Sequence, residues 1–122
     1  MDGLRVNAQL DKVAYITGTS SGIGKALAHK LLAEGFHVVG FSRRNDIDHT
    51  QFEHRKVDFS DLKAVSSIQF NLKGNQTILV NNAGIVGDIK RIGSIQSDAI
   101  IQLQKVNTIA PQLLCNNFVA TF

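Results

Sequence analysis

The sequence predicts an α/β fold: a parallel β-sheet with helices on both faces. Short apolar segments of strand length alternate with segments of helical periodicity, the order that a parallel sheet with crossover helices requires. A glycine-rich turn joins the first apolar segment to the first helical one. The hydrophobic content of 43% and the charged content of 19% are those of a globular protein, and 122 residues make one domain at most, spanning 1–122.

The chain begins with a polar leader, residues 1–11, and the first strand is predicted at Lys12–Thr17. This strand is apolar on both faces, as expected for a parallel strand that helices cover on each side. A helix is predicted over Ile23–Ala33, because its apolar residues recur four positions apart and fall on one face. Gly35 follows it, and glycine favours the left-handed conformation that ends many helices.

Two further strands are predicted in the middle of the chain. The second is Val38–Phe41, a short apolar run, and the third, with a weaker pattern, is Glu53–Val57. The polar segment Asn45–Gln51 between them is interpreted as a loop.

A second helix is predicted over Leu62–Phe70, before the last strand. Either Ser60 or Asp61 can serve as its N-cap, because both side chains accept hydrogen bonds from backbone amides. The fourth strand is predicted at Thr77–Val80, which again is apolar.

The last predicted helix leads to the end of the chain. Ser97 and Asp98 are expected to cap it, and Pro111 inside it is expected to kink it. No charged residue follows Lys105, and the helix keeps a hydrophobic face up to Phe122. We therefore expect this face to be covered by another element or by a second subunit of a homo-oligomer, and the chain to be incomplete after its fourth βα unit.

The glycine-rich turn is the strongest candidate binding site. Gly18 allows a sharp turn, Gly22 lets the backbone approach a pyrophosphate, and Gly24 lets the helix lie close to the strand. The helix N-terminus would offer amide hydrogens and a positive dipole end to the phosphates. An ordinary glycine turn is the alternative. The candidate binding residues of this turn are Gly18, Thr19, Ser20, Ser21, Gly22, Ile23 and Gly24.

Four motifs together resemble the short-chain dehydrogenase/reductase family, in its ordinary, non-extended form, from about Lys12 onward. They are the G-x-x-x-G-x-G spacing, Thr17 before it, Asp58 at a strand end, and Asn81-Asn82-Ala83-Gly84. The resemblance implies a Rossmann-type sheet in the order 3-2-1-4. It also implies that the chain supplies the N-terminal, cofactor-binding half of such a protein.

The resemblance also implies roles for residues at two strand ends. Asp58, with Phe59 beside it, would meet the adenine, where the carboxylate can accept a hydrogen bond; the alternative is an acid that flanks the helix near its cap. Asn82, Ala83 and Gly84 would line the cofactor beside the ribose. The alternative for the asparagines is a turn held by side-chain-to-backbone hydrogen bonds.

The choice of cofactor depends on the end of the second strand. A site for NAD places an acid there to accept from the ribose 2′-hydroxyl, whereas this sequence has Ser42, Arg43 and Arg44. A guanidinium suits the oxygens of a 2′-phosphate, so NADP (NADPH) is favoured and NAD is less favoured. The alternative is a pair of solvated arginines, partly neutralised by Asp46 and Asp48.

The catalytic residues are largely missing from this sequence. Family members use a serine, a Tyr-x-x-x-Lys pair and a helical asparagine, and only Asn107 matches, in the setting Lys105-Val106-Asn107. The single tyrosine, Tyr15, lies in the first strand and is not followed by the lysine. The resemblance therefore implies an NADP-dependent oxidoreductase, but the chain alone is expected to be nearly inactive. A non-catalytic dinucleotide-binding or interaction module is the alternative.

The remaining features indicate the partners and the compartment. The substrate implied by the resemblance is a small carbonyl or alcohol. The basic residues are scattered, which argues against nucleic acid, and no apolar stretch is long enough for a membrane span. The single cysteine, Cys115, favours a reducing, cytoplasmic compartment. The four histidines have no metal-site spacing, so no metal is expected.

Overall fold

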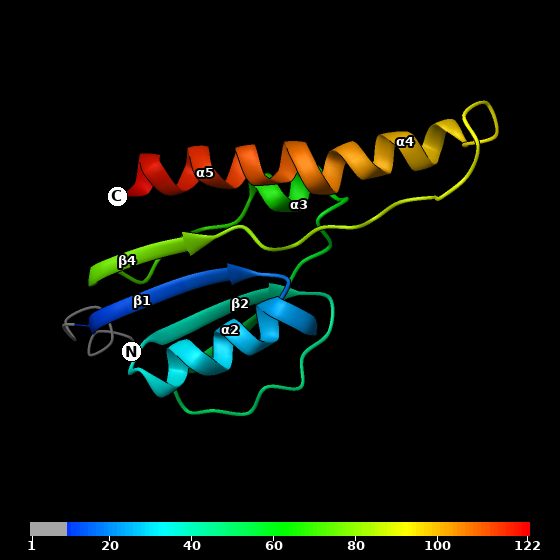
Figure 1. Cartoon of the computed structure of the whole chain (residues 1–122). Coiled ribbons are helices and arrows are strands. Elements are labelled where there is room, and N and C mark those ends of the chain that lie inside the picture. The colour runs from blue at the N-terminus through cyan, green and yellow to red at the C-terminus, as the bar shows by residue number, and fades with distance from the viewer. Residues whose placement is uncertain (1–9) are drawn as a thin grey trace. The chain divides into compact units, whose positions relative to one another are not determined.

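The computed structural model describes residues 10–122 (Figure 1). The predicted polar leader therefore lies outside the described residues, apart from its last two positions. The chain divides into two compact parts, and each is described by itself. The sheet part comprises the residues up to Lys56 together with Phe70–Asn82, and the helical part comprises Val57–Gln69 with Ala83–Phe122.

The sheet part contains a four-stranded parallel sheet in the order β3-β2-β1-β4. This confirms the predicted parallel sheet and its strand order. Each predicted strand is present, although the bounds differ by up to three residues. The elements of this part are β1 (Leu10–Thr17), α2 (Gly22–Ala33), β2 (His37–Ser42), β3 (Phe52–Lys56) and β4 (Gly74–Val80).

The register brings the carboxyl ends of three strands to one edge of the sheet. Thr17 pairs with Phe41 of β2, and Ile16 pairs with Val80 of β4. The chain therefore leaves β1, β2 and β4 at neighbouring points. In open parallel sheets, ligands bind outside this edge.

Helix α2 packs on the sheet through a buried hydrophobic core. The core residues are fully or almost fully buried, so their burial supplies most of the stability of this packing. They are Ala14, Ile16, Ala28, Leu32, Phe36, Val38 and Ile47. The helix ends as predicted: Gly35 has a φ of 89°, and its amide donates to the Leu32 carbonyl at 3.1 Å.

Tyr15 of β1 lies in an aromatic cluster within the sheet part. Its ring meets Phe70 edge-on at 4.9 Å between centroids, and Phe41 lies 6.2 Å away. The phenol donates to the Leu72 carbonyl at 2.7 Å and accepts from the Leu72 amide at 2.8 Å. A hydroxyl that is fully buried would otherwise lose its hydrogen bonds to water.

We expect Tyr15 to ionise only at a pH above the ordinary value of 10.0 for tyrosine. Burial is the main cause: it raises the pKa of the phenol, and the hydrogen bond with Leu72 and the charge of Arg55 only partly oppose it. The stability that this shift contributes is fully present below the unfolded-state pKa, and is lost as the pH rises through the folded-state pKa. The absorbance of tyrosinate measures the pKa of Tyr15 directly, because the chain has one tyrosine and no tryptophan. If Tyr15 ionises at the same pH midpoint in the native protein and in denaturant, the prediction is contradicted.

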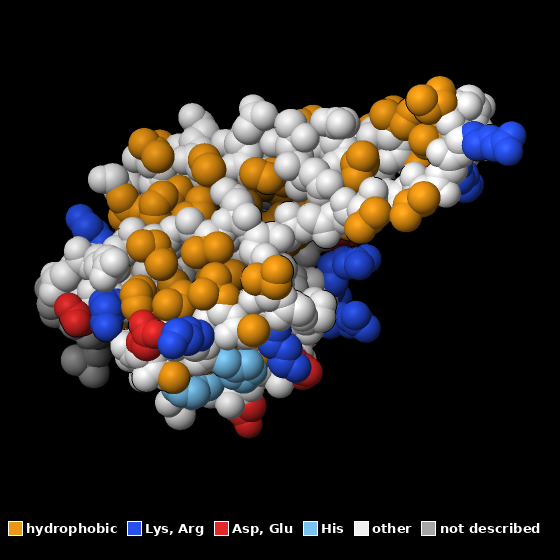
Figure 2. Space-filling model, in the orientation of Figure 1, with side chains coloured by type: hydrophobic (Ala, Val, Ile, Leu, Met, Phe, Trp, Pro, Cys, Tyr) orange, Lys and Arg blue, Asp and Glu red, His pale blue; other side chains and the backbone are white. Residues whose placement is uncertain are grey.

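The helical part contains α3 (Leu62–Ser66) and a long C-terminal helix. The long helix consists of α4 (Ser97–Gln104), a π-helical segment (Lys105–Ile109) and α5 (Ala110–Thr121). Large hydrophobic side chains remain on its surface and on the loop before it (Figure 2). They include Ile85, Val86, Ile89, Ile92, Ile100, Ile101, Ile109 and Val119.

Helix α3 is shorter than predicted. It ends at Ser66, whereas the sequence pattern predicted a helix up to Phe70. Phe70 instead belongs to the aromatic cluster of the sheet part, so the chain must leave the helix before it. Of the two predicted N-caps, Asp61 is the one observed, because its carboxylate accepts from the Ala64 amide at 3.1 Å.

The start of α4 differs from the prediction, and Pro111 lies inside the long helix as predicted. Gln96 is the N-cap, and Ser97 and Asp98 are the first helical residues, so the predicted cap was wrong by one position. Pro111 stands in the first turn of α5, directly after the π-helical segment. Since proline cannot donate a hydrogen bond and its ring crowds the carbonyl of Asn107, four residues earlier, the wider π turn accommodates it.

Candidate functional site

The glycine turn has the backbone geometry that its residues predicted. Gly18 and Gly22 have positive φ angles of 76° and 59°, and the Gly18 amide donates to the Phe41 carbonyl at 2.8 Å. A Cβ on Gly24 would collide with the Gly18 carbonyl oxygen and with Nδ2 of Asn82. A Cβ on Gly22 would meet nothing within 4 Å. The turn is therefore tightly packed at Gly24 and open at Gly22.

The N-terminus of α2 is suited to an anionic group. Ser21 is the N-cap, but its side chain makes no capping hydrogen bond. The amide hydrogens of the first helical turn have no acceptor within the helix, and the helix dipole adds positive potential there. The residues of the turn therefore fit a pyrophosphate.

The side chains of the glycine turn differ in their exposure to solvent. Ile23 is 79% exposed, whereas Thr19 is fully buried. The Thr19 hydroxyl lies against Gly40, where a Cβ would come within 2.5 Å of it, and it has no hydrogen-bond partner among the described residues. Thr19 therefore offers no surface to a ligand in this structure, and its predicted binding role stays a prediction.

Asn82 connects the ends of β1 and β4. Its backbone amide donates to Oγ1 of Thr17 at 2.9 Å, and its side chain donates to the Gly18 carbonyl at 3.3 Å. These contacts fit the alternative interpretation of the asparagines, a turn held by hydrogen bonds between side chains and backbone. They also hold Gly18 in place beside Gly24.

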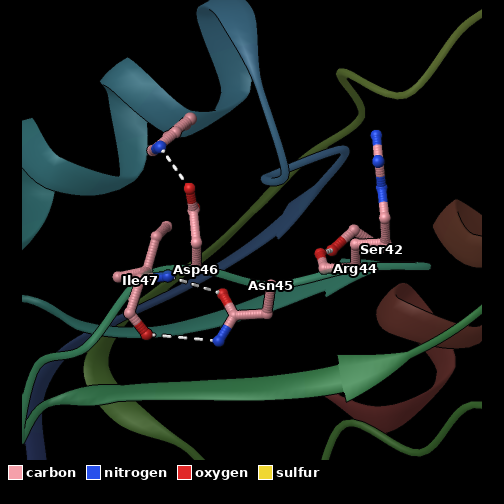
Figure 3. A network of polar contacts seen from close by, with 6 residues as sticks. Ser42, Arg44, Asn45, Asp46 and Ile47 are labelled. Atoms are coloured by element: carbon pink, nitrogen blue, oxygen red, sulfur yellow. Dashed lines mark hydrogen bonds and ion pairs between the residues drawn. The ribbon is translucent and has the colours of Figure 1, made fainter.

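The turn after β2, drawn in Figure 3, contributes three of the four residues that line an open pocket of about 370 Å³. The pocket is lined by Ser20, Arg44, Asn45 and Asp46. Arg43 is exposed but is not part of this lining. The side chain of Ser42 is buried, and its hydroxyl donates to the Arg44 carbonyl at 2.5 Å. Of the three predicted residues, Arg44 is thus the one that lines the pocket.

Charge in this pocket is arranged differently from the expectation. Lys25 of α2 binds the Asp46 carboxylate at 2.8 Å, and this hydrogen bond lowers the pKa of that carboxyl. Asp46 therefore pairs with the lysine and not with the arginines. The Arg44 side chain makes no hydrogen bond or ion pair with any of the described residues, although the Arg44 carbonyl accepts from Ser42, and the side chain points away from Asp46 (Figure 3).

Asp58 and Phe59 lie in the helical part. One carboxylate oxygen of Asp58 accepts from the Ser60 amide at 2.9 Å and from the Ser60 hydroxyl at 2.7 Å, while Phe59 is buried. These bonds support the alternative reading of Asp58 as an acid that shapes the turn before α3. Its contact with adenine stays a prediction.

Ala83, Gly84 and Asn107 also belong to the helical part. The Asn107 side chain accepts from the Ile85 amide at 2.8 Å and donates to the Ile85 carbonyl at 2.7 Å. A Cβ on Gly84 would stand 3.3 Å from the Asn107 oxygen. Asn107 thus fastens this loop to the π-helical segment, and its catalytic role stays a prediction.

Sequence reasoning missed Lys25, Asn45 and His54 as parts of this region. Lys25 pairs with a residue 21 positions away, and His54 meets Ser42 across two strands. Asn45 did lie in a predicted polar loop, but nothing in its sequence context linked it to a pocket. The register of β2 and β3 brings His54 to Ser42, and the position of α2 beside the loop after β2 brings Lys25 to Asp46.

The part of the chain that the structure describes contains neither a metal-binding cluster nor a membrane-spanning helix. Within residues 10–122, no three His, Cys, Asp or Glu side chains lie close enough together to hold a metal ion. No helix within residues 10–122 is both long and apolar enough to cross a membrane.

Comparisons with known proteins agree with the fold. A sequence model described as short chain dehydrogenase matches residues 12–122. A benzil reductase ((S)-benzoin forming) of Bacillus subtilis is 34% identical over 116 residues, which cover 88% of this chain and 47% of that protein. The chain spans about half the length of such curated relatives.

Two solved structures are similar over most of the chain. A short-chain dehydrogenase/reductase from Burkholderia vietnamiensis has a TM-score of 0.82 and 24% identity, over 93% of this chain and 58% of that one. A 4-hydroxyisoleucine dehydrogenase complexed with NADH has a TM-score of 0.81 and 25% identity, over 91% of this chain and 49% of that one.

Proposed function

The chain belongs to the short-chain dehydrogenase family, and from this premise we propose that it is the cofactor-binding half of an NADP-dependent oxidoreductase. The reaction is hydride transfer between the nicotinamide and a small carbonyl or alcohol substrate. A cytoplasmic location and self-association through the C-terminal helix remain predictions.

The observation that carries the proposal is the uncapped N-terminus of α2 next to the glycine turn. Backbone amides of Ser20 to Gly24 would hold the pyrophosphate, and Gly22 leaves open space for its approach. Asn82 holds the turn in this geometry through the Gly18 carbonyl. When bound, the dinucleotide supplies or accepts the hydride. The chain's own residues bind and orient it.

The preference for NADP is supported by the charge at the pocket. The Arg44 guanidinium has no partner among the described residues, whereas the neighbouring acid, Asp46, is held by Lys25. A guanidinium with unused donors can bind a 2′-phosphate through two parallel hydrogen bonds. One similar structure carries NADH, so both cofactors need to be measured.

Replacing Arg44 with alanine is expected to weaken NADPH binding about ten- to a hundredfold, because a hydrogen bond to a charged group contributes about 1.5–3 kcal/mol. NADH binding should change little, since NADH has no 2′-phosphate. Titration calorimetry with each cofactor measures the two dissociation constants.

Arg43→Ala is the matched control for this experiment. It removes the same charge from a position that does not line the pocket, so its effect on NADPH binding should be clearly smaller. Equal losses for both cofactors in Arg44→Ala, or an equal effect of the two substitutions, would refute the assignment of Arg44.

A non-catalytic dinucleotide-binding module is the second candidate. It is favoured by Tyr15, because the only tyrosine of the chain is fully buried and bonded to the Leu72 backbone, where it can protonate no substrate. Without a tyrosine and lysine pair, the developing alkoxide lacks an acid of suitable pKa. A coding sequence that continues beyond Phe122 with a serine and a Tyr-x-x-x-Lys pair would decide for the enzyme.

A further inference from the structure

His54 of β3 contacts the turn that carries Arg44. Its Nε2 lies 3.0 Å from the Ser42 hydroxyl and 3.1 Å from the Ser42 carbonyl oxygen. The Ser42 hydroxyl in turn donates to the Arg44 carbonyl at 2.5 Å. Ser42, at the centre of these contacts, is only 5% exposed, whereas His54 is half-buried and Arg44 is exposed.

The direction of these hydrogen bonds follows from the number of protons. A hydroxyl has one proton, and that of Ser42 points to the Arg44 carbonyl, so the oxygen must accept from the imidazole. The other atom near Nε2, the Ser42 carbonyl, can only accept. Both contacts therefore require a proton on Nε2 of His54.

Side-chain hydrogen bonds also hold the far end of this turn, between Asn45 and Ile47. The Asn45 side chain accepts from the Ile47 amide at 3.0 Å and donates to the Ile47 carbonyl at 3.2 Å (Figure 3). Ile47 is buried in the core beneath α2, and Asp46 is tied to Lys25. Among the described residues, the side-chain hydrogen bonds that hold the backbone between Ser42 and Arg44 are therefore those of Ser42 and His54.

We propose that His54 is a positioning residue for recognition of the 2′-phosphate: by donating to Ser42, it fixes the backbone from which Arg44 reaches the pocket. This inference rests on the proposed NADP-binding function. His54 itself touches no ligand. Its contribution is to keep the guanidinium in place before the cofactor arrives, which reduces the entropy lost on binding.

The test compares NADPH and NADH dissociation constants for His54→Ala and His54→Gln by titration calorimetry. We expect His54→Ala to weaken NADPH binding about three- to tenfold, the effect of one hydrogen bond, with NADH binding unchanged. His54→Gln keeps an N–H donor and should restore most of the loss. The matched control is His37→Gln, a buried histidine at the opposite end of β2, which should change neither constant.

A second variant and a spectroscopic measurement keep the test independent of the folding of His54→Ala. Ser42→Ala removes the same link from the other side and should give the same selective loss. The long-range ¹H–¹⁵N spectrum of the unliganded protein should place the imidazole proton on Nε2 of His54. A proton found on Nδ1 alone would overturn the inference.

The binding results separate the two levels of the proposal. If the unmodified protein binds neither dinucleotide, the proposed function fails. If it binds NADPH preferentially but His54→Ala and Ser42→Ala leave the NADPH-to-NADH ratio unchanged, only the role of His54 fails. Equal weakening of both cofactors would show a merely structural histidine and would also overturn the inference.

Discussion

Replacing Gly24 with alanine is expected to destabilise the protein by about 3 kcal/mol and to abolish dinucleotide binding. The added Cβ would overlap the Gly18 carbonyl oxygen and would stand 2.9 Å from the Gly18 carbonyl carbon. These are backbone atoms in a turn that the Phe41 carbonyl and Asn82 hold fixed, so they cannot move aside cheaply. Helix α2 would have to shift away from β1, and its N-terminus would move with it.

Urea unfolding and a titration with NADPH measure the two effects of this substitution. Gly22→Ala is the matched control, because a Cβ there meets nothing within 4 Å and only the positive φ of 59° opposes it. The cost of that backbone conformation is about 1 kcal/mol. A Gly24→Ala variant as stable as the unmodified protein would show that the packing described here is wrong.

Tyr15→Phe is expected to lower the free energy of unfolding by about 2–4 kcal/mol, although it removes a single oxygen atom. The carbonyl and the amide of Leu72 both lose their partner, and each unsatisfied buried group costs about 1–3 kcal/mol. Leu72 is only 7% exposed, so water cannot easily replace the phenol. The aromatic contact with Phe70 remains in the variant.

Denaturant unfolding monitored by circular dichroism measures this loss. Ser67→Ala serves as the control, because it removes a hydroxyl that also donates to a backbone carbonyl, that of Lys63 at 2.9 Å, but at an exposed position. It should change the stability by no more than about 0.5 kcal/mol. If Tyr15→Phe and Ser67→Ala lower the free energy of unfolding by the same small amount, the buried hydrogen bonds of Tyr15 do not contribute the stability predicted here.

The order of strands and helices could be predicted because each element leaves a local signal. Val38–Phe41 is a run of apolar residues, and the apolar periodicity of α2 is complete within one segment. The end of α3 left no such signal. The helical pattern continues toward Phe70, but the aromatic contact with Tyr15 outweighs the small local preference for one more helical turn.

The sequence by itself determined the parallel sheet, the glycine turn and the presence of two arginines after β2. These features depend on residues that are near neighbours in the chain, where φ angles and periodicity are decided locally. Only the tertiary structure decided that Arg44 lines the pocket, that Lys25 neutralises Asp46, and that His54 supports Ser42. Those contacts join residues on different elements, and strand register and packing, which no local pattern encodes, bring them together.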